Sequence, residues 1–168
     1  MTLYEIISNL EQIALTQPNV RTADNGDIYD YMNANPSITY SVFFITHTNS
    51  RADEEYDYYT MNLFYIDRLT DDYNNRLQVQ SIGRSVLDNI VRIFCDRYDV
   101  DYPSETNILF TPFTERFSDL TAGQYCTLTL AIPKTLICGD EGDNLPTIEI
   151  NDNGSYIFGG YKIVVDVE

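Results

Sequence analysis

The order of the predicted elements constrains the fold of this chain more than any single motif. A short amphipathic helix comes first, followed by two aromatic strands, a long helix and two further strands. Each helix has one apolar stripe and must bury it against another layer, which here can only be the sheet that the strands build. The order therefore predicts an α+β domain. We expect an antiparallel or mixed four-stranded sheet packed against the long helix, with the short N-terminal helix beside it.

Two helices carry clear signals. Thr2 and Glu5 have the spacing of a capping box, and apolar residues then recur at three- and four-residue steps until the chain reaches Pro18. The segment Thr70-Asp71-Asp72 predicts the start of the second helix, which spans six or seven turns. Its predicted apolar stripe consists of Leu77, Ile82, Val86, Leu87, Ile90, Val91, Ile93 and Phe94.

The strands are rich in β-branched and aromatic residues. The first two cover 37–48 and 56–69, and the polar segment 49–55 between them predicts an antiparallel hairpin with an acidic tip, Asp53-Glu54-Glu55. Residues 19–36 contain two turn signals and are expected to form an ordered loop or a short helix. Two later strands are predicted at 106–113 and 124–132, the second with a period of two.

The sequence changes character after Cys138. Residues 139–144 resemble an acidic linker, and the Asn153-Gly154 pair predicts a β-hairpin turn in the last twenty residues. Two isolated strands are marginally stable, so this arm should attach to the main sheet, another subunit or another protein. We therefore expect a main domain at 1–138 and a linker with a C-terminal β-hairpin arm at 139–168.

The charge balance limits the choice of partners. With 10 Lys and Arg against 26 Asp and Glu, the formal net charge is −16, which repels nucleic acid and anionic membranes. The N-terminus lacks the pattern of a signal peptide, and no apolar run approaches the roughly 20 residues that cross a bilayer. Cys95, Cys126 and Cys138 are odd in number and widely spaced. These features predict a soluble chain made in a cytosol, with reduced thiols and no membrane contact.

Few residues suggest chemistry, and we expect neither an enzyme nor a bound metal or cofactor. His47 is the single histidine, and no partner lies at ligand or nucleophile spacing in the sequence. The acidic clusters 140–144 and 151–154 lack the spacing of an EF-hand. The Asp53-Glu54-Glu55 group could imitate a glycosidase carboxylate pair, although adjacent acids in so acidic a chain are usually a solvated loop.

Positive charge concentrates in the long helix. Candidate subunit-interface residues there are Arg76, Arg84, Arg92 and Arg97. One interpretation is that they bind an acidic patch on a neighbouring copy of the chain. The other, equally weighted, is ordinary pairing within the chain to acids such as Asp88 and Asp96.

The order of elements over residues 1–133 resembles the tail-terminator and tail-completion proteins of tailed bacteriophages and the related neck-ring proteins. Residues 114–132 (TERFSDLTAGQYCTLTLAI) are similar to the corresponding stretch in phages of gut Bacteroidetes, including the crAss-like group. Residues 148–167 resemble short β-units with an N-G-x-Y and G-Y pattern in phage structural proteins.

The resemblance implies a virion protein of the neck or tail, made in the host cytoplasm. It implies a homo-oligomeric ring of six or twelve copies that contacts the portal, another neck ring or tail proteins. DNA would pass through without sequence-specific binding, and Asp53, Glu54 and Glu55 would line the channel or touch the next ring. The alternative is an acidic, non-catalytic binding module for a carbohydrate or protein ligand. A small α+β hydrolase has the least support.

Overall fold

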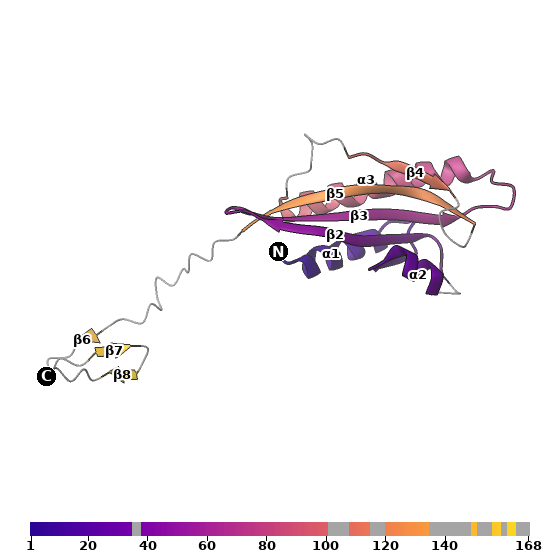
Figure 1. The fold of residues 1–168 in the computed structure, drawn as a ribbon. Helices are drawn as coiled ribbons and strands as arrows, with labels where there is room; N and C mark the ends of the chain where they lie inside the picture. The colour runs from indigo at the N-terminus through magenta and orange to yellow at the C-terminus, as the bar shows by residue number, and fades with distance from the viewer. Residues whose placement is uncertain are drawn as a thin grey trace. The chain divides into compact units, whose positions relative to one another are not determined.

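A computed structural model describes residues 1–34, 38–100, 108–114 and 120–134, together with three short strands after residue 148. The chain divides into two compact units, Met1–Lys134 and Thr135–Glu168. The elements of the first unit are α1 (Leu3–Leu15), β1 (Thr22–Asn25), α2 (Ile28–Ala34), β2 (Val42–Ala52), β3 (Tyr56–Arg68), α3 (Arg76–Tyr98), β4 (Thr111–Thr114) and β5 (Thr121–Pro133) (Figure 1).

The sheet of this unit has five strands in the order β1-β2-β3-β5-β4. β1 runs parallel to β2 and every other pair is antiparallel, so the α+β class is confirmed and the sheet is mixed. The prediction of four strands was wrong because β1 was assigned to a loop. Its sequence, Thr-Ala-Asp-Asn, has no apolar alternation. It is a strand because its backbone pairs with the edge of β2, and the local sequence does not reveal this pairing.

The hairpin of β2 and β3 is longer than predicted. β2 continues to Ala52, so the connection is Asp53–Glu55 rather than the whole of 49–55. The register shifts between His47 and Asn49, which places a β-bulge at Thr48. β3 then pairs along its full length with β5, from Tyr56 opposite Pro133 to Arg68 opposite Thr121.

The two faces of the sheet are covered unequally. Phe43 and Ile45 of β2 face α1 and α3 and belong to the main core, whereas Val42 and Phe44 face the opposite way. On that opposite face α2 packs through Ile28 and Met32 over one end only (Figure 1). Toward the hairpin the same face carries polar side chains, namely Thr60, Asn62, Thr127 and Thr129, which are half-buried or exposed.

The N-terminal helix agrees with its prediction. The Thr2 hydroxyl accepts a hydrogen bond from the Glu5 N–H at 3.3 Å, and a Glu5 carboxylate oxygen accepts the Thr2 N–H at 2.6 Å. Ile6, Leu10 and Ile13 are fully buried, as their spacing indicates. The capping box and the apolar stripe therefore place α1 on the sheet in one orientation.

The second helix begins later than predicted, at Arg76. The Thr70 hydroxyl donates to Asp72, and the Asn75 side chain binds both the Thr70 N–H and the Arg68 carbonyl, so these polar groups build a turn rather than a helix cap. Leu77 is 73% exposed, so its place in the predicted stripe was wrong. Val79 and Gly83 lie against the sheet in its stead.

The C-terminal unit contains β6 (Glu149–Ile150), β7 (Tyr156–Phe158) and β8 (Tyr161–Ile163) in an antiparallel sheet of three strands. The predicted β-hairpin was therefore one strand short. The sequence contains a signal for the extra strand, because the pair Gly159-Gly160 between the two segments is typical of tight turns. The Asn153-Gly154 pair and the acidic segment 139–144 fall outside the described residues.

No helix in the described part of the chain combines the length and the apolar character needed to cross a membrane.

Candidate functional site

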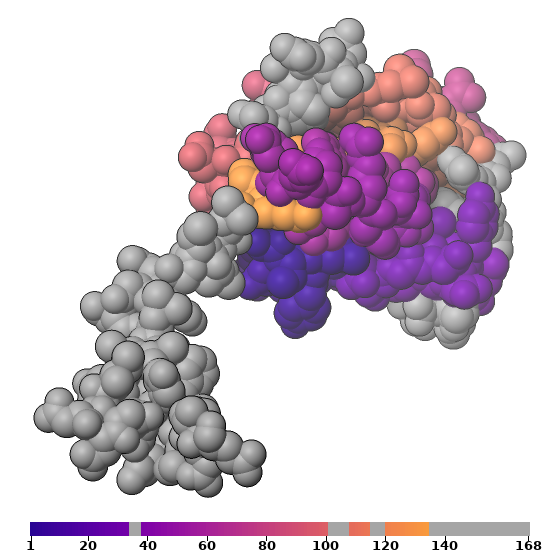
Figure 2. Space-filling model, turned by 60° about the vertical axis from the view of Figure 1, so that its left-hand side comes forward, coloured from indigo at the N-terminus to yellow at the C-terminus, as the bar shows by residue number. Residues whose placement is uncertain are grey.

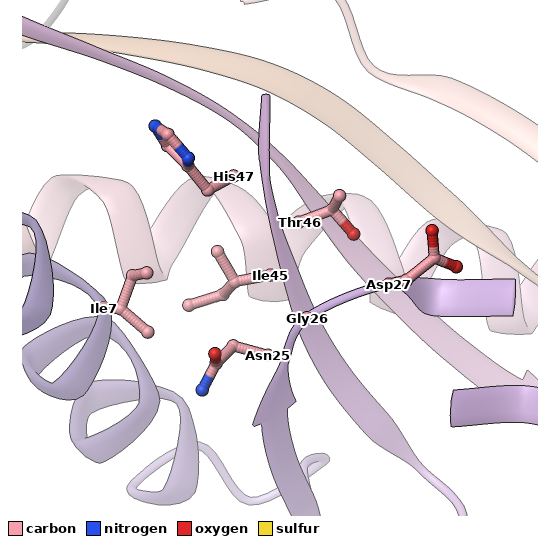
Figure 3. Close-up of a pocket in the computed structure, with 7 residues that line it drawn as sticks. All are labelled: Ile7, Asn25, Gly26, Asp27, Ile45, Thr46 and His47. Carbon is pink, nitrogen blue, oxygen red and sulfur yellow. The ribbon is translucent and has the colours of Figure 1, made fainter. Parts of the chain in front are cut away.

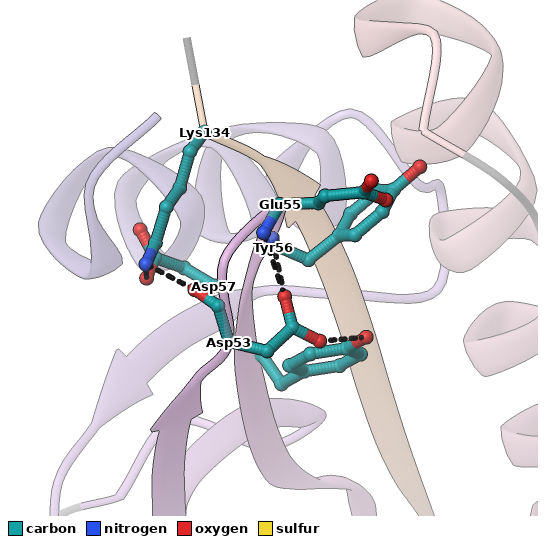
Figure 4. A network of polar contacts seen from close by, with 6 residues as sticks. Asp53, Glu55, Tyr56, Asp57 and Lys134 are labelled. Carbon is teal, nitrogen blue, oxygen red and sulfur yellow. Dashed lines mark hydrogen bonds and ion pairs between the residues drawn. The ribbon is translucent and has the colours of Figure 1, made fainter. Parts of the chain in front are cut away.

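The end of the hairpin is organised around Asp53. Its carboxylate accepts the backbone N–H of Glu55 at 2.9 Å, the N–H of Tyr56 at 2.7 Å and the hydroxyl of Tyr58 at 2.8 Å (Figure 4). An Asp side chain that binds backbone N–H groups two and three residues ahead fixes a tight turn. Asp53 is therefore engaged in building the turn. Among the described residues, no hydrogen bond reaches the carboxylates of Glu54 and Glu55, which are exposed and available to a partner.

Lys134 braces this turn from the end of β5. Its N–H donates to the Glu55 carbonyl at 2.8 Å, and its ammonium group donates to the Asp53 carbonyl (Figure 4). The ammonium nitrogen also lies 3.9 Å from a carboxylate oxygen of Asp57. In Figure 2 the hairpin end stands forward next to the orange end of β5. The tip is thus tied to a third strand.

The pKa values at the turn follow from these contacts. The pKa of Asp53 lies below its usual range, chiefly because the Tyr56 N–H stabilises the carboxylate and also because the Tyr58 hydroxyl and the Glu55 N–H do so. The pKa of Tyr58 is raised because its hydroxyl donates to Asp53. The Arg51 guanidinium lies 4.2 Å from the centre of the Tyr58 ring, a cation–π distance.

The arginines of α3 do not form a single stripe. Arg76, Arg84 and Arg92 are eight residues apart, and each step of eight rotates the position by about 80° around the helix axis. Arg92 pairs with Asp88 at 3.0 Å, which is the intramolecular alternative, and Arg84 lies 5.7 Å from the ring centre of Phe110. All four arginines, Arg97 included, are exposed. Their role at a subunit interface stays a prediction.

His47 is exposed on β2, and the fold brings Ser50 to it. The His47 Nε2 atom lies 2.9 Å from the Ser50 Oγ and 3.0 Å from the Asn49 carbonyl oxygen. A carbonyl only accepts hydrogen bonds, so Nε2 carries the proton and cannot at the same time deprotonate Ser50. Because no described side chain orients the other ring nitrogen, this pair stabilises the bulged strand rather than forming a nucleophile and base.

Burial changes the pKa of three further groups, Tyr65, Cys126 and the half-buried Asp67. Burial raises the pKa of Tyr65 to about 12 and that of the Cys126 thiol to about 12, and it also raises the pKa of Asp67. A thiol with so high a pKa stays protonated and unreactive near neutral pH. Within the described residues no group of three His, Cys, Asp or Glu side chains is placed to hold a metal ion.

A pocket of about 240 Å³ lies where β1 ends beside β2 (Figure 3). Its lining residues are Ile7, Asn25, Gly26, Asp27, Ile45, Thr46 and His47. Figure 3 shows Ile45 and His47 on one side of β2 and Thr46 on the other, so the pocket wraps around the strand edge. This pocket was not predicted from the sequence, because β1, which ends at it, was not recognised as a strand.

No protein-family model matches this chain, and no curated protein matches it either.

Proposed function

We propose that this chain is a structural subunit of a bacteriophage head-to-tail connector, a neck or tail-terminator ring that surrounds the DNA channel and joins neighbouring virion proteins. The observation that supports this most is the braced hairpin. A three-stranded extension of β2, β3 and β5 ends in a turn held by Asp53 and Lys134, and it presents the side-chain carboxylates of Glu54 and Glu55, which accept no hydrogen bond from a described residue. Such a projection suits contact between subunits better than turnover of a substrate.

Charge distribution adds support. Nineteen of the 26 acidic and nine of the 10 basic residues lie within Met1–Lys134, and seven acidic residues and one basic residue lie beyond it. Both units are thus acidic. An acidic channel wall repels the phosphate backbone, which lets DNA pass without adhering.

Basic and acidic side chains on the surface are candidates for the contacts between neighbouring copies. The exposed Arg76, Arg84 and Arg97 of α3 form no ion pair with a described carboxylate, whereas Glu54 and Glu55 present exposed carboxylates at the turn between β2 and β3. Complementary patches at different places on one subunit make a head-to-tail contact, and repetition of such a contact closes a ring when the rotation allows it.

A second candidate function is a non-catalytic binding module, favoured by the uncovered polar face of the sheet. There Thr60 and Thr129 hydroxyls lie 3.1 Å apart, and the Thr127 hydroxyl donates to Asn62 at 2.8 Å. A flat row of hydroxyl and amide groups can hydrogen-bond a carbohydrate or a protein surface. This candidate predicts a monomer.

Light scattering during size exclusion tests the proposal on the full chain and on a chain that ends at Cys138. We expect a discrete assembly of six or twelve copies, and class averages in electron microscopy should show a ring. The double variant Glu54→Gln and Glu55→Gln keeps the Asp53 turn and should weaken assembly, whereas Asp71→Asn, a change of an exposed acid elsewhere, should not. A full chain that stays monomeric at high concentration, alone and with a portal or tail extract, would favour the binding module.

A further inference from the structure

The outer edge of β2 is only partly paired. β1 pairs with β2 from Val42 to Ile45, and the last contact is the Gly26 N–H donating to the Ile45 carbonyl at 3.0 Å. From Thr46 to Ala52 no strand of the described chain pairs with this edge. Backbone N–H and C=O groups of such an edge are unsatisfied except by water, and they match the groups of an added strand.

The pocket lies at the start of this open edge. Its lining comes from both faces of the sheet, and it occupies the space into which β1 would continue if Gly26 did not turn the chain toward α2 (Figure 3). Gly26 has φ of 130°, a conformation that side chains with a Cβ rarely adopt. The turn at Gly26 therefore ends β1 and opens the pocket.

The size and lining of the pocket indicate which kind of chemical group fits it. Its volume, about 240 Å³, is below the roughly 300–1,000 Å³ of pockets that hold whole small molecules. Ile7 and Ile45 provide apolar contact on the side of α1. On the other side the Thr46 hydroxyl oxygen is buried without a hydrogen-bond partner in the described chain. One aliphatic side chain on an extended backbone fits this combination.

We propose that the open edge of β2 is a strand-addition site for an extended segment of a partner protein, anchored by an aliphatic side chain in the pocket. The backbone of the segment hydrogen-bonds the edge beyond Ile45, and one of its side chains enters the pocket. The bulge at Thr48 makes the edge irregular further along, and the His47 ring lies against the Asn49 carbonyl. This irregularity reduces indiscriminate pairing between copies.

Charge specifies the segment further. Asp27 lines the pocket, Asp24 binds the Asn25 N–H, and Glu11 accepts the Asn25 side-chain amide at 2.7 Å. Asp27 and Asn25, to which Glu11 is bonded, both line the pocket, so this end of the edge is acidic, whereas Arg51 lies at the far end beside Tyr58. The added segment should therefore carry Lys or Arg next to its anchor residue, which also suits a partner drawn to a chain of net charge −16.

The first probe is a fluorescein-labelled peptide of twelve residues that alternates Lys with Val, tested with the full chain. Two controls have Glu in place of Lys, or Pro at every second position to remove backbone N–H groups. We expect the Lys-Val peptide to raise fluorescence anisotropy and to slow amide hydrogen exchange at those residues of 46–52 whose N–H groups point away from β3. Neither control peptide should do so.

Two protein variants make the site assignment specific. Asp27→Asn keeps the N-cap of α2, since Asn caps as well as Asp, and should weaken binding about two- to fivefold with a smaller salt dependence. Ile7→Trp fills the pocket from α1 and should weaken binding about tenfold or more. Their matched controls, Asp71→Asn and Leu15→Trp, change exposed residues elsewhere and should leave the affinity unchanged.

Three results would overturn the proposal. The first is binding of the Lys-Val peptide without protection of residues 46–52. The second is equal binding of the Glu peptide, which would show that charge does not select the segment. The third is slow exchange, in the chain alone, of those amides at 46–52 that point away from β3, because an edge already covered by another copy or by the chain itself is not open to a partner.

Discussion

At the scale of single residues, the carboxylate of Asp53 has a structural role, because it accepts the hydrogen bonds that hold the hairpin turn. The pKa of Asp53 is depressed, so its contribution to the hairpin turn is present above the usual Asp pKa of about 4 and is lost as the pH falls through the lower value of the folded state. We therefore expect the protection factor of the Tyr56 amide, which is its intrinsic exchange rate at each pH divided by the observed rate, to fall as the solution is acidified through this range.

The variant Asp53→Ala should show fast exchange at Glu55 and Tyr56 at every pH, and Asp53→Asn should retain part of the protection because its carbonyl still accepts hydrogen bonds. Glu54→Gln is the matched control, since its carboxylate is exposed at the same turn. If the protection of the Tyr56 amide changes neither on acidification nor in the Asp53→Ala variant, this role of Asp53 is contradicted.

Gly83 is a second decisive residue, because α3 and the sheet touch at this point. A Cβ placed on Gly83 would lie 2.7 Å from the Cδ1 atom of Tyr65 and 3.3 Å from the Cβ of Gln124. Tyr65 is 1% exposed and has little room to move. Although Ala is the better helix former, Gly83→Ala should lower the free energy of unfolding by about 1–3 kcal/mol, measured by urea denaturation. Ser85→Ala on the exposed side of α3 should raise it slightly; a stabilised Gly83→Ala would show that the helix can shift.

At the scale of elements, α3 illustrates how a helix ends. Asp99 follows its last residue in the left-handed conformation, with φ 51° and ψ 41°, and the Val100 N–H donates to the Cys95 carbonyl at 3.1 Å. Glycine takes this conformation without the steric cost of a Cβ, so Asp99→Gly should raise the free energy of unfolding by about 0.5–1 kcal/mol. Asp96→Gly, one turn earlier, should instead lower it by about 1 kcal/mol. Equal effects of the two variants would rule out the left-handed cap.

The three-strand extension is the second element whose behaviour depends on one contact. Lys134 joins the end of β5 to the hairpin turn, and its ammonium group is the only described cation within ion-pair distance of Asp57. Lys134→Met keeps the length of the side chain and removes its charge, so fast motion should increase at 53–57 in ¹⁵N relaxation measurements while the melting temperature changes little. Unchanged relaxation at the turn would mean that the β3–β5 ladder alone holds it.

At the scale of the whole molecule, the net charge of −16 is the dominant property. Repulsion among surface carboxylates destabilises the compact state, and salt screens it with a Debye length of about 10 Å at 0.1 M. Raising the sodium chloride concentration at a fixed protein concentration should therefore raise the melting temperature. Sucrose serves as the uncharged control. A melting temperature that falls with salt would indicate that specific ion pairs outweigh the general repulsion.

Local sequence by itself determined the elements whose signals lie within a few residues. The capping box of Thr2 and Glu5, the stripe of α1 and the alternation of β5 are set by short-range spacing and recur in the structure. The α+β class follows from their order, because amphipathic helices and strands have few ways to bury their apolar faces together.

Only the tertiary structure decided the remaining features. β1 is a strand because β2 supplies its hydrogen-bond partners. Leu77 is exposed because α3 begins only at Arg76, after the turn at 70–75. The pocket, the Lys134 brace and the contact of Gly83 with Tyr65 each join residues distant in sequence. Hydrogen bonds and steric contacts act through space, so the candidate sites became visible only once the chain was folded.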